Sequence, residues 1–139
     1  MAYGILDARR RRLSYSSAGQ TPPVWMSARE DTVELLPNCE GFPLKLVQPD
    51  VTYENSDLRM DRGDKLVLYT DGLTETINEA MDLYGIERMK QSLRARRHCP
   101  PPERAGLIVA DAQEFADGAP QNDDISLLLI DVLDGAKAS

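Results

Sequence analysis

Two acidic sites lie at the ends of two strongly apolar segments of this 139-residue sequence. Residues 66–70 (Leu-Val-Leu-Tyr-Thr) lead directly into Asp71-Gly72, and Asn122-Asp123-Asp124 leads directly into residues 125–130 (Ile-Ser-Leu-Leu-Leu-Ile). If the apolar segments are neighbouring antiparallel strands, the end of the first and the start of the second share one edge of the sheet. Asp71 and Asp123 would then lie close together. Carboxylate oxygens are the ligands that hard cations such as Mg²⁺ and Mn²⁺ prefer, so the pattern predicts a cation site.

The residues beside the two aspartates fit the same chemistry. Gly72 has no Cβ, so its backbone can come close to an ion and adopt φ values that other residues avoid. Two cations sharing carboxylates would lower the pKa of a bridging water and clamp a phosphoryl group for in-line attack. Glu75 could contact a metal-bound water, and Asp124 could support Asp123. Asp-Gly after a strand is also typical of an ordinary turn, and the second acidic pair is what favours the cation site.

The elements that position these residues follow from hydrophobic periodicity and from turn residues. The first half predicts short strands at residues 1–6, 13–18, 24–26, 32–36 and 65–70, with a proline- and glycine-punctuated loop at 37–49 and loose alternation at 51–58. The second half predicts one helix from Ile86 and a second from Pro101, since proline is tolerated in a first helical turn. Residues 117–120 end the second helix, and residues 125–132 form the last strand.

This order of elements indicates an α+β fold with antiparallel pairing. The strands at 65–70 and 125–130 are almost continuously apolar, so we expect both to be buried on both faces, with helices over one face and a second sheet over the other. The length suits one domain. We assign residues 1–132 to that domain and expect residues 133–139 to be a frayed tail.

Composition and charge exclude several classes of protein. A formal net charge of −7 argues against nonspecific binding to nucleic acid or to an acidic membrane, because phosphate groups would be repelled. No apolar stretch approaches the roughly 20 residues needed to span a bilayer. Cys39 and Cys99 are far apart and are interpreted as free thiols of a reducing compartment, which predicts a cytoplasmic protein.

Several motifs together strongly resemble the PPM family of metal-dependent serine/threonine protein phosphatases, in its bacterial SpoIIE/RsbU-type branch. They are residues 63–75, Tyr84-Gly85-Ile86 and residues 122–126. Residues 17–23 look like that branch's Ala-Gly-His-x-Pro turn, and residues 41–44 look like its Gly-x-Pro-Leu-Gly segment. The resemblance covers nearly the whole chain in the right order.

The resemblance implies an αββα sandwich, a binuclear Mn²⁺/Mg²⁺ centre, and direct attack of a metal-activated water on phosphoserine or phosphothreonine. Asp71 and Asp123 would match two metal ligands, with Gly72 beside the first, and no catalytic residue is identified apart from the ligands. The implied setting is bacterial signalling. The implied partner is a phosphorylated protein such as an anti-sigma-factor antagonist, as in sigma factor regulation.

The sequence also departs from the family pattern. The family has an earlier Asp-x-Ser/Met-Gly-x-Gly motif whose aspartate bridges both metals, and no residue before Asp71 matches it. The chain therefore resembles the C-terminal part of a catalytic domain, and we predict too few ligands for tight binuclear metal binding by this chain alone. Gln20 stands where histidine is usual, and Lys45 where glycine is usual.

Two further interpretations stay open at this stage. The chain could be a catalytically degenerate phosphatase fold that acts as a regulatory or protein-binding module, and strand edges left unpaired could support a homodimer. The run Arg9-Arg10-Arg11-Arg12 could hold a phosphorylated partner through bidentate contacts, or it could be a solvated hairpin loop.

Overall fold

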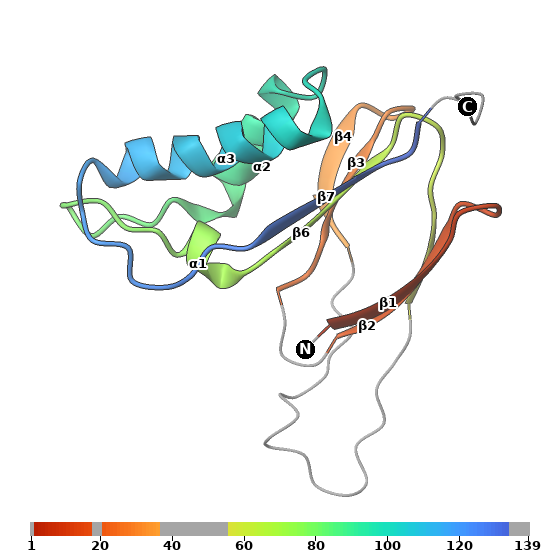
Figure 1. Cartoon of the computed structure of the whole chain (residues 1–139), viewed down its shortest axis with the longest axis horizontal. Helices are drawn as coiled ribbons and strands as arrows, with labels where there is room; N and C mark the ends of the chain where they lie inside the picture. The colour runs from red at the N-terminus through yellow and green to blue at the C-terminus, as the bar shows by residue number, and fades with distance from the viewer. Residues whose placement is uncertain (1, 18–20, 37–55, 134–139) are drawn as a thin grey trace, which may run out of the picture. The chain divides into compact units, whose positions relative to one another are not determined.

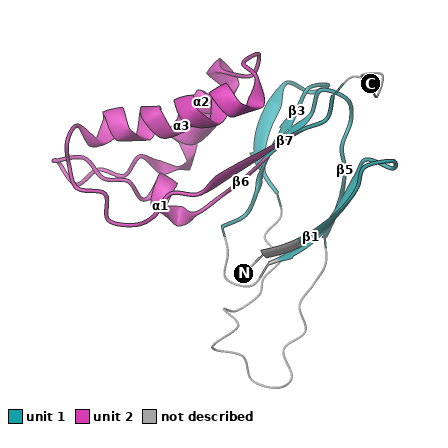
Figure 2. Cartoon of the chain, viewed as in Figure 1, with its two compact units in different colours: residues 1–66, 131–139 teal, residues 67–130 magenta. Residues whose placement is uncertain are grey.

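The computed structural model describes residues 2–17, 21–36 and 56–133 (Figure 1). The chain divides into two compact units, residues 1–66 with 131–139, and residues 67–130 (Figure 2). The elements in chain order are β1 (Ala2–Asp7), β2 (Arg12–Ser17), β3 (Val24–Ser27), β4 (Thr32–Leu35), β5 (Ser56–Arg59), β6 (Lys65–Tyr69), α1 (Asp71–Thr74), α2 (Gly85–Ala95), α3 (Pro101–Ala116) and β7 (Leu127–Asp131). The predicted α+β class with antiparallel sheets is confirmed. The predicted loop at 37–49 and all of the predicted tail at 133–139 except Leu133 lie outside the described residues.

The first unit contains a three-stranded antiparallel sheet in the order β1-β2-β5. Leu13 and Tyr15 on β2 are buried, and the residues that alternate with them are not, which is the period of a strand with one covered face. The hairpin interpretation of the arginine run holds for its backbone, because residues 8–11 form the turn between β1 and β2. The Asp7 carboxylate closes this turn by accepting hydrogen bonds from the amides of Arg9 and Arg10.

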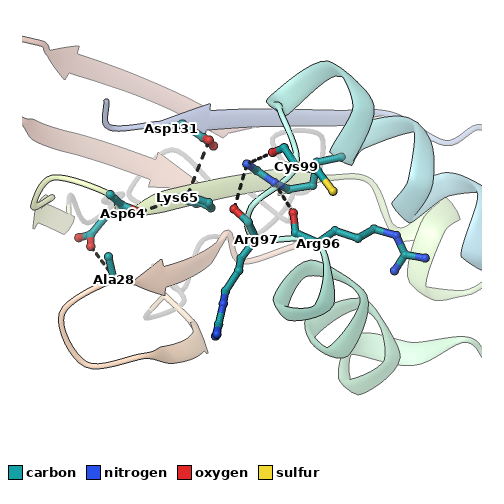
Figure 3. A network of polar contacts seen from close by, with 9 residues as sticks. Ala28, Asp64, Lys65, Arg96, Arg97, Cys99 and Asp131 are labelled. Atoms are coloured by element: carbon teal, nitrogen blue, oxygen red, sulfur yellow. Dashed lines mark hydrogen bonds and ion pairs between the residues drawn. The ribbon is translucent and has the colours of Figure 1, made fainter. Parts of the chain in front are cut away.

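The strands β3 and β4 form a second hairpin of the first unit, with Val24 paired to Leu35 and Ser27 to Thr32. Beside it lies Asp64, which is only 1% exposed. The Asp64 carboxylate accepts hydrogen bonds from Trp25 Nε1 (3.1 Å) and from the amides of Ala28 and Asp61 (2.9 Å each; Figure 3 shows the Ala28 contact). A buried carboxylate with three donors is satisfied, so Asp64 holds the turn before β6 in place.

The second unit packs α2 against α3. The buried residues of α3 recur every four positions, at Arg104, Ile108, Ala112 and Ala116, which places them on one helical face. Opposite them, α2 buries Met89, Ser92 and Leu93. Between the two helices, Asp111 accepts a hydrogen bond from the Ser92 hydroxyl and pairs with Arg96 at 2.7 Å.

Arg104 is 2% exposed, and its hydrogen-bond partners include three backbone oxygens. Its guanidinium donates to the carbonyl oxygens of Arg96 (3.1 Å), Arg97 (3.4 Å) and Cys99 (2.6 Å), which follow the end of α2 (Figure 3). Arg96 O also accepts the Cys99 amide (3.0 Å), so Arg104 adds side-chain donors to the turn that follows α2. The buried guanidinium thereby has hydrogen-bond partners of its own.

The strands β6 and β7 are antiparallel neighbours. The amide of Thr70 donates to Ser126 O (3.0 Å), and the amide of Val132 donates to Asp64 O (2.9 Å), so residue numbers fall along β7 as they rise along β6. Burial on both faces is confirmed for β6, where Leu66, Val67 and Tyr69 are all buried. The same expectation is wrong for β7, because Leu128 is 57% exposed. Among the described strands β7 is the outermost of its sheet, and an edge strand is covered less than a central one.

Within the described ranges, none of the helices is both long enough and apolar enough to cross a membrane.

Candidate metal centre

Asp71 lies at the point where β6 changes into a short helix. Thr70 has extended backbone angles (φ −94°, ψ 156°), and Asp71 is the first residue of the four-residue helix α1. The carbonyl oxygen of Asp71 accepts hydrogen bonds from the Glu75 amide (2.8 Å) and the Thr74 hydroxyl (3.3 Å). Its side chain is exposed. The helical turn was missed from the sequence, although Thr followed by Asp is a common start of a helix.

Gly72 lies directly against the segment that contains Asp123 and Asp124. A Cβ atom on Gly72 would be 2.2 Å from the carbonyl oxygen of Asp124 and 3.3 Å from that of Asp123. A contact of 2.2 Å is impossible for a side-chain carbon, so only glycine allows the two backbone segments to come this close.

Thr70 joins the same two segments by hydrogen bonds. Its hydroxyl donates to Asp124 O (3.1 Å) and accepts from the Ser126 amide (2.9 Å). Because this hydroxyl takes the place of a ladder carbonyl, regular β7 begins at Leu127 and not at the predicted Ile125. Residues 54 positions apart in the sequence are thus fixed side by side. The expected shared edge of the sheet is present.

Asp123 and Asp124 are both exposed. The Asp123 carboxylate accepts a hydrogen bond from the Asp124 amide (2.8 Å), and the carbonyl oxygen of Asp123 accepts one from Gln121 Nε2 (2.7 Å). Asp124 contacts the Thr70 hydroxyl through its carbonyl oxygen, which leaves its carboxylate at the surface. These bonds hold the backbone of the segment and keep carboxylate oxygens available to solvent.

Glu75 follows α1 and is exposed, and its backbone amide is the group that binds Asp71. The carbonyl oxygen of Gly72 accepts a hydrogen bond from the Thr76 hydroxyl (2.9 Å). The five predicted site residues therefore divide between the β6–α1 junction and the approach to β7. The structure brings Asp71-Gly72 and Asp123-Asp124 together through their backbones, while Glu75 lies one helical turn further along.

The donor set at this edge fits part of a binuclear centre. Residues 2–17, 21–36 and 56–133 contain no group of three or more histidine, cysteine, aspartate or glutamate side chains that could hold a metal ion. Mg²⁺ and Mn²⁺ keep several waters and bind through a few carboxylates, so Asp71 and Asp123 suit one side of such a site. Among the described residues, no third metal-ligating side chain joins them.

Tyr69 precedes this junction, and its buried phenol is protonated at neutral pH. The side chain is 7% exposed, and burial raises the pKa of its phenol to about 12. The phenol therefore does not act as a general base at neutral pH.

Sequence reasoning missed two buried charged residues, Asp64 and Arg104. Asp64 lacks the glycine context of a bridging aspartate, but its place in a tight turn before an apolar strand is typical of a structural carboxylate. Arg104 follows two prolines at the start of a helix and carries no sequence signal of burial, because arginine side chains are mostly exposed.

Comparison with known families gives a match over almost the whole chain. The sequence profile of the family Stage II sporulation protein E (SpoIIE) matches residues 1–133. Protein IcfG of Synechocystis sp. is 27% identical over 136 residues, which cover 92% of this chain and 20% of that protein. Phosphoserine phosphatase RsbU of Bacillus subtilis is 32% identical over 79 residues, which cover 57% of this chain and 23% of RsbU. The chain thus spans about a fifth of the length of these curated relatives.

Solved structures show the same fold. The SiaA-PP2C domain of Pseudomonas aeruginosa superposes with a TM-score of 0.76 at 25% identity, covering 94% of this chain and 50% of that one. The phosphatase domain of the cell fate determinant SpoIIE from Bacillus subtilis, presoaked with manganese, gives a TM-score of 0.75 at 16% identity, covering 98% of this chain and 57% of that one. The fold is therefore PP2C-like, and the chain spans about half the length of these domains.

Proposed function

The chain belongs to the SpoIIE family of PP2C-like phosphatase domains, and from this membership we propose that it supplies the C-terminal part of a metal-dependent phosphoserine/phosphothreonine protein phosphatase. One observation carries the proposal. The contact between Gly72 and Asp124 O can be made only by glycine, and it sets Asp71 and Asp123 at one edge of the sheet.

In this proposal Asp71 and Asp123 are ligands of Mn²⁺ or Mg²⁺, and Gly72 lets its backbone come close to the ion. Asp124 and Glu75 lie further out and would contact metal-bound water. When bound, the metal pair supplies an activated water for direct attack on the phosphate. This chain's own contribution is to present two exposed carboxylates on backbone segments that Thr70 joins.

The remaining ligand belongs to the Asp-x-Ser/Met-Gly-x-Gly motif, which this sequence does not contain. We therefore assign no hydrolytic step to the chain alone. The curated relative RsbU is named a phosphoserine phosphatase, which supports the class of substrate. We propose a phosphorylated signalling protein of the anti-sigma-factor antagonist type as partner, in the cytoplasm, with a homodimer as the form in which unpaired strand edges would be covered.

Metal binding is tested by titrating Mn²⁺ into the isotopically labelled chain and following amide signals by NMR. Because Mn²⁺ is paramagnetic, even weak binding broadens signals of nearby residues. We expect broadening around Asp71-Gly72 and Asp123-Asp124, and its loss in Asp71→Asn and in Asp123→Asn. Asp117→Asn, which changes an exposed aspartate at the end of α3, is the matched control. Broadening spread evenly over all acidic residues would refute the ligand assignment.

Catalysis is tested separately with p-nitrophenyl phosphate and with a phosphoserine protein in the presence of Mn²⁺. We expect the chain alone to show little or no turnover. A polypeptide carrying the Asp-x-Ser/Met-Gly-x-Gly motif, added in trans, is expected to give Mn²⁺-dependent phosphate release that Asp71→Asn abolishes. Robust turnover by the chain alone would overturn the claim that its ligand set is incomplete.

A regulatory or protein-binding module is the second candidate. One observation favours it: the described residues offer no group of three metal-ligating side chains. Under this alternative, the Mn²⁺ titration gives no localised broadening, and no release of phosphate accompanies addition of the missing motif.

A further inference from the structure

A strongly basic pocket lies on the first unit, at the turn between β1 and β2. It has a volume of about 570 Å³ and is lined by Arg9, Arg10, Arg11, Arg12, Asp57 and Arg59. We call this set the basic pocket. Five of its six lining residues are arginines in a chain of formal net charge −7, so positive charge is concentrated here against the overall balance.

Only two of these arginines are paired with carboxylates of the described residues. Arg12 contacts Asp57 at 2.6 Å, and Arg10 lies 3.8 Å from the Asp7 carboxylate. Hydrogen bonds from the Ser14 hydroxyl and from Arg12 lower the pKa of Asp57, so this carboxylate stays charged and occupied. Arg9, Arg11 and Arg59 have no ion pair with any residue that the structure describes. Their guanidinium groups are available to an external anion.

The turn at the pocket places an arginine where turn preferences do not favour one. Across the β2–β5 ladder Arg12 is opposite Arg59, and since Asp57 pairs with Arg12, Arg59 is left without an ion pair among the described residues. Arg11 has φ of 52°, in the left-handed region where glycine or asparagine is the common choice in a turn. Arginine at this left-handed turn position goes against local preference. Such conflicts concentrate at functional sites, which supports a binding role for the turn.

We infer that the basic pocket binds an acidic, phosphate-bearing peptide segment of a partner protein. Guanidinium groups bind phosphate and carboxylate bidentately, and three unpaired ones around one concavity match a phosphorylated side chain with acidic neighbours. Nucleic acid and anionic membrane fit less well, because the rest of the chain would repel an extended surface of phosphates. The inference does not depend on catalysis, since no predicted metal ligand lines the pocket.

The test uses the whole chain and a fluorescein-labelled peptide with one phosphoserine between glutamates. Binding is followed by fluorescence anisotropy in buffer with a chelator, so that neither metal nor hydrolysis contributes. We expect Arg9→Gln/Arg11→Gln/Arg59→Gln to weaken binding at least about tenfold, as expected for the loss of several charge-assisted contacts. The matched control, Arg29→Gln/Arg62→Gln/Arg94→Gln, removes the same charge from exposed arginines outside the pocket and is expected to stay within about twofold.

A lysine variant, melting curves and competing ligands test the same proposal. Arg9→Lys/Arg11→Lys/Arg59→Lys preserves charge and is expected to bind between the wild type and the glutamine variant, because lysine cannot bind bidentately. Circular dichroism melting verifies that each variant is folded. Equal losses in the pocket and control variants would overturn the proposal, as would equal affinity for the peptide with serine in place of phosphoserine. Tighter binding to phosphatidylserine vesicles or to single-stranded DNA than to the phosphopeptide would overturn it too.

Discussion

The two ends of β6 carry aspartates with opposite roles. Asp64, just before the strand, is 1% exposed, and its carboxylate accepts three hydrogen bonds. Asp71, just after the strand, is exposed, and the hydrogen bonds that fix it in place run through its carbonyl oxygen. In sequence the two look alike, since each stands in a turn next to glycine at the boundary of one apolar segment.

Burial and hydrogen bonding of the side chain distinguish a structural carboxylate from one that is available to a ligand. A buried carboxylate that accepts three protein hydrogen bonds is closed to a cation from solvent, and its removal leaves buried donors unsatisfied. A carboxylate fixed by its backbone and exposed through its side chain contributes little to folding and can bind something else. The following predictions test this contrast, beginning with the change that should have the largest effect.

Replacing Asp64 should destabilise the fold strongly. Asp64→Ala leaves the donors on Trp25, Ala28 and Asp61 without a buried acceptor, so we expect a loss of about 3–5 kcal/mol in the free energy of unfolding. Urea unfolding measures it. Asp61→Ala, at an exposed residue of the same turn, is the control and should change stability by less than about 0.5 kcal/mol. A small effect of Asp64→Ala would show that burial does not distinguish the two ends.

Gly72 should tolerate no side chain, whereas another glycine of the second unit should. Gly72→Ala places a Cβ 2.2 Å from Asp124 O, and separating the two segments should cost about 2–3 kcal/mol. Gly106 lies inside α3, where an added Cβ would have no neighbour within 4 Å, so Gly106→Ala should stabilise the chain by about 0.5–1 kcal/mol. Thermal unfolding compares the pair, and equal effects of the two substitutions would contradict the close approach at Gly72.

The strand between the two aspartates should respond to alkaline pH. Burial raises the pKa of Tyr69 from 10.0 in the unfolded chain to about 12 in the folded one. Its contribution to stability is complete below pH 10.0 and is lost as pH rises toward about 12, because only the unfolded chain ionises readily in that range. Unfolding measured across this window should show the loss, by about 1 kcal/mol given partial solvent screening, and Tyr69→Phe should flatten it. An unchanged slope in Tyr69→Phe would assign the loss to other groups.

The smallest effect on folding is expected at Asp71. Asp71→Asn keeps the size and the backbone of an exposed residue, so the free energy of unfolding should change by less than about 0.5 kcal/mol. The same substitution should remove the Mn²⁺-dependent NMR broadening. A large destabilisation would mean that Asp71 is a structural carboxylate like Asp64, and the contrast between the two ends of β6 would disappear.

Periodicity and turn residues predicted most of the strands and both long helices, because β2, α2 and α3 each bury one face at a regular interval. The shared edge of Asp71 and Asp123 also followed from the sequence, since two apolar strands flanking a helical section pair naturally. The exposure of Leu128 did not follow from the sequence, because the position of a strand in its sheet depends on partners far along the chain. The burial of Arg104 could not be predicted either, since its partners include three carbonyl oxygens that follow another helix.

The bonds between Thr70 and the Asp124–Ser126 segment close a loop of 54 residues that contains α2 and α3. Closing a loop of that length has an entropic cost that only the folded helices can offset. The two aspartates are therefore held side by side only while this loop is closed. A cation held there would slow the opening of the loop, so the hydrogen-exchange rate of the Ser126 amide becomes a direct gauge of metal occupancy.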